Sequence, residues 1–295
     1  MSMLDRTGSL LRATVADLPA PVAEALARPE PGEEGSVDAD GTGWGIRRWG
    51  VPTERPLLLV HGVTSSAGIW WRIGPALAAA GFRVTAVDMP GHGRTPWRGR
   101  HRFGDSAVAL AAFIKAAGFD APDLAVVGHS WGAMVTAHLP AAGMRPRVLV
   151  LLDPPGLTVA QFEVFTRDPT ERPYETVADA RAAVRAANPG WSDGDVEAKA
   201  RGLTEFNADA VLAVLLQNGD WDAGMSALRE PAAAGVPAWL IRGEWATGGF
   251  IPEETVPAIE AQLGREHVIG IAGGPHSPQR THPEETVAAI LRAIA

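Results

Sequence analysis

The sequence predicts an α/β fold in which helices cover both faces of a mostly parallel central sheet. Short apolar runs of strand length recur along the chain, helical patterns separate them, and the runs are continuously apolar instead of alternating. Continuously apolar strands are typical of a parallel sheet that is buried on both faces. At 295 residues, the chain is long enough to bury one large core and to carry an insertion.

The expected elements alternate along most of the chain. We expect strands at 57–60, 84–87, 124–127, 148–152, 237–241 and 268–271, and helices at 73–80, 108–117, 133–142, 253–263 and 283–294. Residues 157–230 break this order, because they hold helical patterns and several aromatic residues but no convincing strand. The sequence therefore predicts an N-terminal extension at 1–35, a core at 36–156 and 231–295, and a helical lid at 157–230.

Composition excludes several classes of function. Lys and Arg total 26 and Asp and Glu total 34, so a net charge of −8 disfavours nucleic-acid binding. The absence of Cys excludes disulfides, thiolate nucleophiles and Cys-bound metals. No apolar stretch reaches the roughly 20 residues that span a bilayer, and charged residues interrupt every candidate signal peptide. We expect a cytoplasmic protein without metal, cofactor or stable membrane insertion, and the sequence allows a homodimer.

One serine lies where a nucleophile is expected. Gly128-His129-Ser130-Trp131-Gly132 directly follows the strand at 124–127 and precedes a helix. On such a tight turn the flanking glycines relieve crowding and the serine Oγ is held exposed. A second Gly-x-Ser-x-Gly match, at 190–194, follows no strand, and Ser192 with Asp195 fits the start of a helix instead. Only Ser130 is therefore predicted to be a nucleophile.

Acyl transfer by a serine requires a base and donors for an oxyanion. His276 is the best candidate for the base, because it lies in a Gly-Gly-Pro-His-Ser turn just after the last expected strand. The backbone N–H of Trp131 directly follows Ser130 and is one expected donor. The second is the N–H of Val63, in the loop after the strand at 57–60.

Four motifs in this order resemble the α/β-hydrolase superfamily, from about residue 44 to the C-terminus. They are the His61-Gly62 turn, the Asp88-Met89-Pro90-Gly91-His92-Gly93 segment, the elbow at 128–132 and the turn that holds His276. The resemblance implies the α/β-hydrolase fold and the chain order nucleophile, acid, base. In the strand numbering of the family, 148–152 is strand 6 and 237–241 is strand 7, so the lid expected at 157–230 is inserted between strands 6 and 7. Asp88 is better explained as holding the turn that follows it.

The acid departs from the family pattern. Members usually carry it three residues after a glycine at the end of strand 7, where this chain has Ala246. Two carboxylates could replace it: Asp153, at the end of strand 6, and Glu244, in the usual loop but two residues early. We prefer Asp153 as the partner of His276 and keep Glu244 as the alternative.

The resulting hypothesis is a metal-free serine hydrolase that cleaves small to medium apolar carboxylic esters through an acyl-enzyme. Its expected substrate pocket is aromatic and consists of Trp70, Phe162, Phe165, Trp221 and Trp245. The same serine constellation also serves lactonases, thioesterases, carbon–carbon bond hydrolases and cofactor-free haloperoxidases. Ala246, in the slot of the acid, leaves open a different class, a non-catalytic binding protein of the same fold.

Overall fold

The computed structural model describes residues 10–11, 15–168 and 170–295, so residues 1–9 and 12–14 of the expected N-terminal extension lie outside the described residues. The described chain forms a nine-stranded sheet in the order β1-β9-β8-β7-β6-β4-β5-β3-β2. β3 pairs antiparallel with β2 and β5, and the other pairs are parallel. The strands are β1 (Leu10–Leu11), β2 (Glu33–Ala39), β3 (Thr42–Trp49), β4 (Arg55–Val60), β5 (Phe82–Val87), β6 (Ala125–His129), β7 (Val148–Leu152), β8 (Ala238–Arg242) and β9 (Val268–Ile271).

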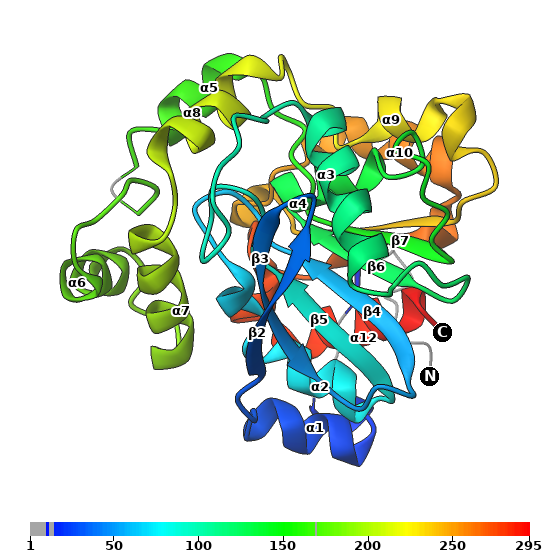
Figure 1. Ribbon diagram of the computed structural model, residues 1–295, viewed down its shortest axis with the longest axis horizontal. Coiled ribbons are helices and arrows are strands. Elements are labelled where there is room, and N and C mark those ends of the chain that lie inside the picture. Colours follow the sequence, from blue (N-terminus) through cyan, green and yellow to red (C-terminus); the bar gives the residue numbers. More distant parts are fainter. Residues whose placement is uncertain (1–9, 12–14, 169) are drawn as a thin grey trace.

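Helices cover both faces of this sheet, which confirms the expected α/β architecture (Figure 1). One face carries α1 (Ala20–Ala27), α2 (Ile73–Ala79) and α12 (Pro283–Ala293), and the other carries α3 (Phe103–Ala116) and α4 (Trp131–Ala137). Within β4, Leu57 and Leu59 pack with α2 and α12, whereas Leu58 and Val60 pack with α3. Because successive side chains point to opposite faces, a sheet covered twice requires continuously apolar strands.

An antiparallel hairpin that the apolar runs did not predict closes one edge of the sheet. β2 pairs with β3 along its full length, with Ala39 opposite Thr42. The two residues between them, Asp40 and Gly41, have positive φ values of 52° and 68°. A two-residue turn of this kind favours Asp-Gly, so a sequence signal for the hairpin was present. β2 begins at Glu33, two residues before the expected end of the N-terminal extension, and β1, which lies within that extension, pairs with β9.

The segment 157–230, called the cap here, leaves the sheet between β7 and β8, where an inserted helical segment was expected. It contains α5 (Val159–Phe165), α6 (Val177–Ala187), α7 (Asp193–Thr204), α8 (Ala208–Gln217) and α9 (Met225–Arg229). α6 and α7 project to one side of the sheet in Figure 1. That the cap acts as a lid stays a prediction.

The described residues include no helix that is long and apolar enough to cross a membrane.

Candidate active site

Ser130 lies on the sharp turn between β6 and α4. Its φ and ψ angles are 56° and −123°, and a non-glycine residue at positive φ is strained by about 1–3 kcal/mol. The Ser130 N–H donates to the carbonyl oxygen of Leu152 at 3.0 Å, which ties the turn to the neighbouring strand β7. The turn holds the serine at the carboxyl end of β6, the edge of a parallel sheet at which ligands bind.

Two glycines make this turn possible. A Cβ atom on Gly128 would lie 2.4 Å from the carbonyl oxygen of Gly132. A Cβ atom on Gly132 would lie 2.5 Å from the carbonyl oxygen of His61. Real Cβ atoms do not approach backbone so closely, so only glycine lets α4 begin directly against β6 and the His61 loop. This is the physical reason for glycine at both ends of the Gly-x-Ser-x-Gly motif.

His276 lies between Ser130 and Asp153. Its Nε2 is 2.9 Å from Ser130 Oγ, and its Nδ1 is 2.6 Å from Asp153 Oδ2. These contacts span 146 and 123 residues of sequence, so only the fold brings the three side chains together. An imidazole held in this way can accept a proton at Nε2 while its Nδ1–H donates to the carboxylate.

The carboxylate of Asp153 is fully buried and fully hydrogen-bonded. Oδ1 accepts a hydrogen bond from Gly243 N–H at 2.9 Å, and Oδ2 accepts one from Phe250 N–H at 2.9 Å in addition to that from His276. These donors offset the large cost of removing a charge from water. Glu244, the alternative acid, directly follows Gly243 and is partly exposed. The hydrogen bond of His276 Nδ1 is made with Asp153.

Two further residues hold His276. The ring of Phe250 stacks on the imidazole, with centroids 3.7 Å apart and planes 13° apart. His129 Nε2 donates to the carbonyl oxygen of His276 at 2.9 Å. Burial, and then the neighbouring His276, lower the pKa of His129 well below its ordinary value, so this ring is neutral. The Gly-His-Ser motif was a signal for His129, whereas no sequence pattern indicated Phe250.

The two expected oxyanion donors lie on loops that meet at Ser130. Trp131 begins α4, and the first N–H groups of a helix have no acceptor within the helix. Val63 lies in the loop between β4 and the short 3₁₀ helix η2 (Ala67–Trp70). A Cβ atom on the preceding residue, Gly62, would lie 2.9 Å from Ser130 Cβ, so this loop passes directly beside the serine.

The side chain of His61 fixes the start of that loop. Its Nδ1–H donates to the carbonyl oxygen of Gly62 at 2.7 Å, and its Nε2 accepts a hydrogen bond from Met89 N–H at 3.0 Å. Burial lowers the pKa of His61, which keeps the ring in the neutral form that can both donate and accept. The His61-Gly62 motif is therefore a structural brace for the loop that carries Val63.

Comparison with known proteins assigns the family. A model described as the alpha/beta hydrolase family matches residues 57–290. The chain belongs to the alpha/beta hydrolase family. This confirms the resemblance inferred from the four motifs and the fold that it implied.

Relatives of this alpha/beta hydrolase include enzymes named for ester cleavage. Lipase LipV from Mycobacterium tuberculosis is 31% identical over 267 residues, which cover 84% of this chain and 96% of that protein. A pimeloyl-[acyl-carrier protein] methyl ester esterase from Edwardsiella ictaluri is 29% identical over 259 residues, covering 80% and 92%. The solved structure of E-2-(acetamidomethylene)succinate hydrolase has a TM-score of 0.74 at 20% identity, over 89% of this chain and 99% of that chain, and shows the fold alone.

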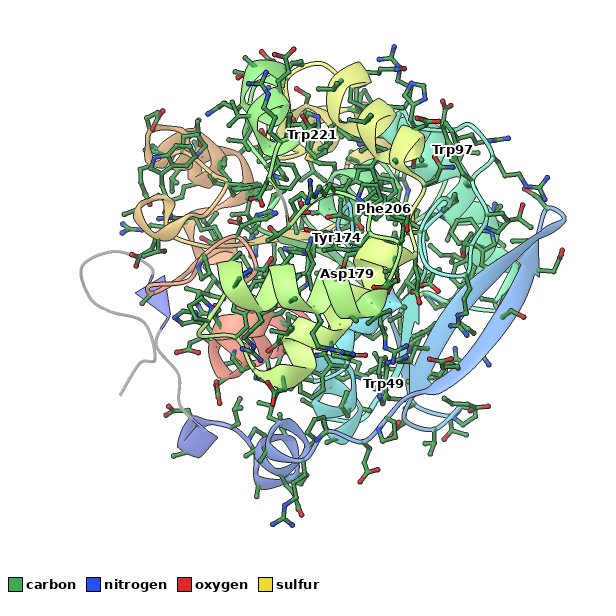
Figure 2. All side chains as sticks on the ribbon, turned by 90° about the vertical axis from the view of Figure 1, so that its left-hand side faces the viewer. Trp49, Trp97, Tyr174, Asp179, Phe206 and Trp221 are labelled. Carbon is green, nitrogen blue, oxygen red and sulfur yellow. The ribbon has the colours of Figure 1, made fainter. Side chains whose placement is uncertain are left out.

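Three of the five expected pocket residues of this alpha/beta hydrolase are buried in its hydrophobic core. Trp70 is fully buried on the face of the sheet that α2 and α12 cover. Phe162 and Trp221 are buried with their ring centroids 4.4 Å apart, and Trp221 also packs edge-on against Phe103 of α3 at 4.9 Å. Figure 2, in which the cap faces the viewer, shows Trp221 near α5. The contacts of Phe162 and Trp221 with each other and with Phe103 attach the cap to the core.

The other two, Phe165 and Trp245, line an open apolar groove of about 440 Å³. Phe250 also lines it, so the ring that stacks on His276 is part of the groove. Trp245 is 41% exposed and Val164 is 67% exposed, so the groove presents neighbouring apolar side chains to solvent. The groove is lined by Leu157, Gln161, Val164, Phe165, Trp245, Gly248, Gly249 and Phe250, none of which is charged.

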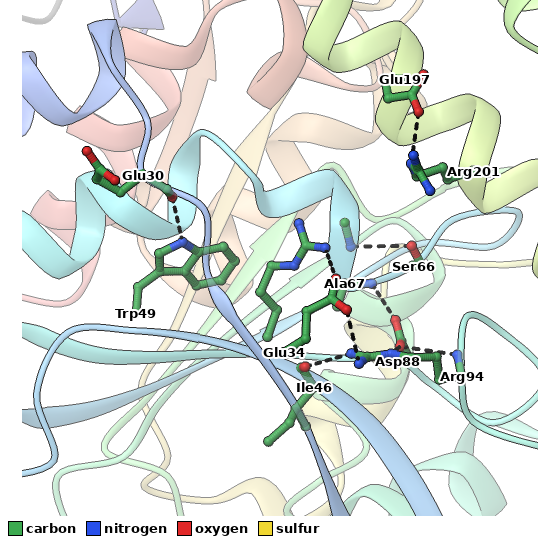
Figure 3. Close-up of polar contacts among 12 residues, drawn as sticks. Glu30, Glu34, Ile46, Trp49, Ser66, Ala67, Asp88, Arg94, Glu197 and Arg201 are labelled. Atoms are coloured by element: carbon green, nitrogen blue, oxygen red, sulfur yellow. Dashed lines mark hydrogen bonds and ion pairs between the residues drawn. The ribbon is translucent and has the colours of Figure 1, made fainter. Parts of the chain in front are cut away.

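Two other motifs have the structural roles that the sequence predicted. Asp88 Oδ1 accepts a hydrogen bond from Ala67 N–H at 2.7 Å and Oδ2 accepts one from Arg94 N–H at 3.2 Å (Figure 3). It thus joins the turn after β5 to η2. Ser192 caps α7, where its Oγ accepts a hydrogen bond from Asp195 N–H at 3.2 Å. Within the described part of the chain, no cluster of three or more acidic or His side chains could hold a metal ion.

Proposed function

We propose that this carboxylic ester hydrolase of the alpha/beta hydrolase family uses Ser130 as nucleophile, His276 as general base and acid, and Asp153 as the acid that orients His276. The observation that carries the proposal is the hydrogen-bonded line from Asp153 through His276 to Ser130, with contacts of 2.6 and 2.9 Å. The names lipase and methyl ester esterase among the relatives support ester cleavage.

In the first half of the proposed reaction, Ser130 Oγ attacks the ester carbonyl carbon while its proton passes to His276 Nε2. The carbonyl oxygen becomes an oxyanion and accepts hydrogen bonds from the N–H groups of Val63 and Trp131. The tetrahedral intermediate then breaks its bond to the alcohol oxygen, and His276 Nε2–H protonates the departing alcohol. Ser130 is left as an acyl ester.

In the second half, a water molecule donates a proton to His276 Nε2 and attacks the acyl-enzyme. The second tetrahedral intermediate releases the carboxylic acid, and the proton returns to Ser130 Oγ. Asp153 stays ionised throughout and stabilises the imidazolium of His276. The face of Phe250 supports the same charged form, because an aromatic face attracts a cation.

The proposed substrate carries a hydrocarbon chain, which occupies the groove lined by Phe165 and Trp245. Support comes from the absence of charge among the groove residues and from Phe250, which belongs to the groove and touches His276. Pockets for small molecules are mostly apolar with a few polar groups at the reacting end. Here those polar groups are Ser130, His276 and the two proposed N–H donors.

Hydrolysis of p-nitrophenyl esters from acetate to octanoate tests the proposal in the wild-type protein and in Ser130→Ala. Ser192→Ala is the matched control, because Ser192 lies in the other Gly-x-Ser-x-Gly match and caps a helix. We expect the loss of Ser130 to lower kcat by at least about 10³-fold. We expect Ser192→Ala to keep kcat within about twofold, because Ser192 Oγ, at the start of α7, bonds Asp195 and Arg72 and the loss of a helix-capping side chain lowers mainly the stability of the fold. Equal rates in wild type and Ser130→Ala would refute the proposal, as would a wild-type protein that cleaves none of the esters.

A further inference from the structure

A buried ion pair in the cap reaches the loop that holds the proposed oxyanion donor. Lys199, on α7, lies with its Nζ 2.7 Å from Oε2 of Glu171, in the segment between α5 and α6. Their side chains are only 7% and 15% exposed. The other two N–H groups of Lys199 donate to Thr64, at 3.0 Å to its Oγ1 and at 3.5 Å to its carbonyl oxygen. Thr64 directly follows Val63, so this pair contacts the core at the oxyanion loop.

Thr64 has a backbone conformation that requires support. Its φ is 54°, in the left-handed region that β-branched residues rarely adopt. The hydroxyl of Thr64 donates to the carboxylate of Glu171 and accepts from Lys199, while Lys199 also binds the carbonyl oxygen. Both the side chain and the backbone of Thr64 are therefore held by the cap. Since His61 holds the other end of the loop, Val63 is fixed from both sides.

The backbone of α7 also lies directly against this loop. A Cβ atom on Gly202, three residues after Lys199, would lie 3.1 Å from Ser65 Cα and 3.3 Å from the carbonyl oxygen of Thr64. Lys199 shares the buried face of α7 with apolar residues such as Val196. A lysine on such a face is rare unless its charge is paired, and this is the sequence signal by which it could have been found.

Separate contacts attach the start of α7 to the core. Asp195 accepts hydrogen bonds from Trp71 Nε1 at 3.0 Å and from Arg72 Nη2 at 3.3 Å, and its carbonyl oxygen accepts one from Arg280 at 3.0 Å. Removing the ion pair of Lys199 therefore leaves α7 attached to the core by these bonds. A role of the pair in positioning the loop can be separated from a role in folding.

We propose that Lys199 and Glu171 are positioning residues of the oxyanion hole, which hold Thr64 so that the Val63 N–H is directed at the oxyanion. The inference rests on the proposed function and extends it, because it makes the cap part of the catalytic machinery. Displacement of α7 from the loop would slow the chemical step even for a substrate that still binds.

The test replaces the pair without leaving a buried charge alone, with the double variant Lys199→Met/Glu171→Met. The matched control is Arg181→Met/Glu197→Met, which removes the exposed ion pair between α6 and α7, 2.6 Å long, together with the 2.9 Å contact of Glu197 with Arg201. Phosphonate titration gives the concentration of active sites, so kcat is measured per folded site. We expect kcat to fall about 10- to 100-fold with KM within about twofold, since losing one oxyanion donor costs about 10²–10³-fold.

Two readouts distinguish positioning from general structural support. A boronic acid that forms a tetrahedral adduct with Ser130 should lose affinity by the same factor as kcat, because it mimics the transition state. Thr64→Val, which removes the hydroxyl but leaves the ion pair, should lower kcat in the same direction, and Thr64→Ser should retain more of it. The Thr64 variants also serve if the double variant does not fold.

Wild-type values of kcat and boronate affinity in the double variant would overturn the proposal, as would a loss confined to KM. A wild-type protein that is itself inactive would overturn the proposed function and this inference together. An active wild type with an equally active double variant would overturn the positioning role alone.

Discussion

Replacing Asp153 with Asn tests the proposed acid with almost no change in shape. The Asp153 carboxylate is 0% exposed and accepts hydrogen bonds from Gly243 N–H, Phe250 N–H and His276 Nδ1–H. An amide has only one oxygen atom, so its NH₂ group must face a donor in either orientation. If the NH₂ group takes the place of Oδ1, Gly243 N–H loses its acceptor. If the NH₂ group takes the place of Oδ2, Phe250 N–H loses its acceptor.

The magnitude follows from these contacts. One buried N–H without an acceptor lowers the free energy of unfolding by about 1–3 kcal/mol. When the NH₂ group faces His276, the proton moves to Nε2 and the ring cannot accept the proton of Ser130. In the other orientation the tautomer survives, but the imidazolium loses the negative charge 2.6 Å away. We expect kcat to fall about 10³- to 10⁴-fold, equal to about 4–5.5 kcal/mol in activation free energy.

The assay compares kcat for p-nitrophenyl butyrate in wild type, Asp153→Asn and Glu244→Gln. Glu244 is partly exposed and Asp153 holds His276 Nδ1, so we expect Glu244→Gln to retain kcat within about twofold. A kcat within tenfold of wild type for Asp153→Asn, with a hundredfold loss in Glu244→Gln, would refute the reasoning and make Glu244 the acid.

Three more predictions test the elbow, the buried histidines and the groove. Gly132→Ala places a methyl group against the carbonyl oxygen of His61, so it should lower the free energy of unfolding by about 1–3 kcal/mol and abolish turnover. In Gly190→Ala the methyl group meets nothing within 4 Å, so thermal unfolding and ester assays should show unchanged stability and unchanged turnover. Burial lowers the pKa of His92 to about 3, so between that value and an unfolded pKa of about 6.5 the unfolded state binds the extra proton. The free energy of unfolding should therefore fall as pH decreases through this range, and His92 should contribute up to about 1.4 kcal/mol per pH unit. His92→Gln should reduce this dependence on pH, as measured by urea unfolding at pH 7 and 5. An unchanged dependence would contradict a neutral, buried His92 in the folded protein. Trp245→Ser should raise KM for the octanoate ester severalfold and leave KM for the acetate ester unchanged. Equal changes in KM for the two esters would place the acyl chain of the substrate outside the groove.

Local sequence was sufficient to predict the order of most strands and helices. Buried parallel strands must be apolar on both faces, so they are visible as continuous runs such as 57–60 and 148–152. The elbow at Ser130 was equally visible, because its glycines are required by backbone contacts within a few residues and with the adjacent His61 loop. The hairpin β2–β3 was missed although its Asp40-Gly41 turn carried a signal, because its strands alternate instead of being continuously apolar.

Other features depended on contacts between residues far apart in the chain. The sequence left Asp153 and Glu244 as rival partners of His276, because the outcome depends on which strand end lies beside a loop more than 100 residues away. It also could not separate Trp70, a core residue, from Trp245, which lines a groove, since both are large apolar side chains beside motifs.

The sequence by itself determined the family, the fold class and the nucleophile candidate of this protein, because these depend on periodicity and on short-range backbone constraints. Only the tertiary structure decided which carboxylate contacts His276, which aromatic rings are core, and that Lys199 reaches Thr64 across 135 residues of sequence. Such pairings are set by packing and by the need to pair buried charges, and neither leaves a fixed spacing along the chain.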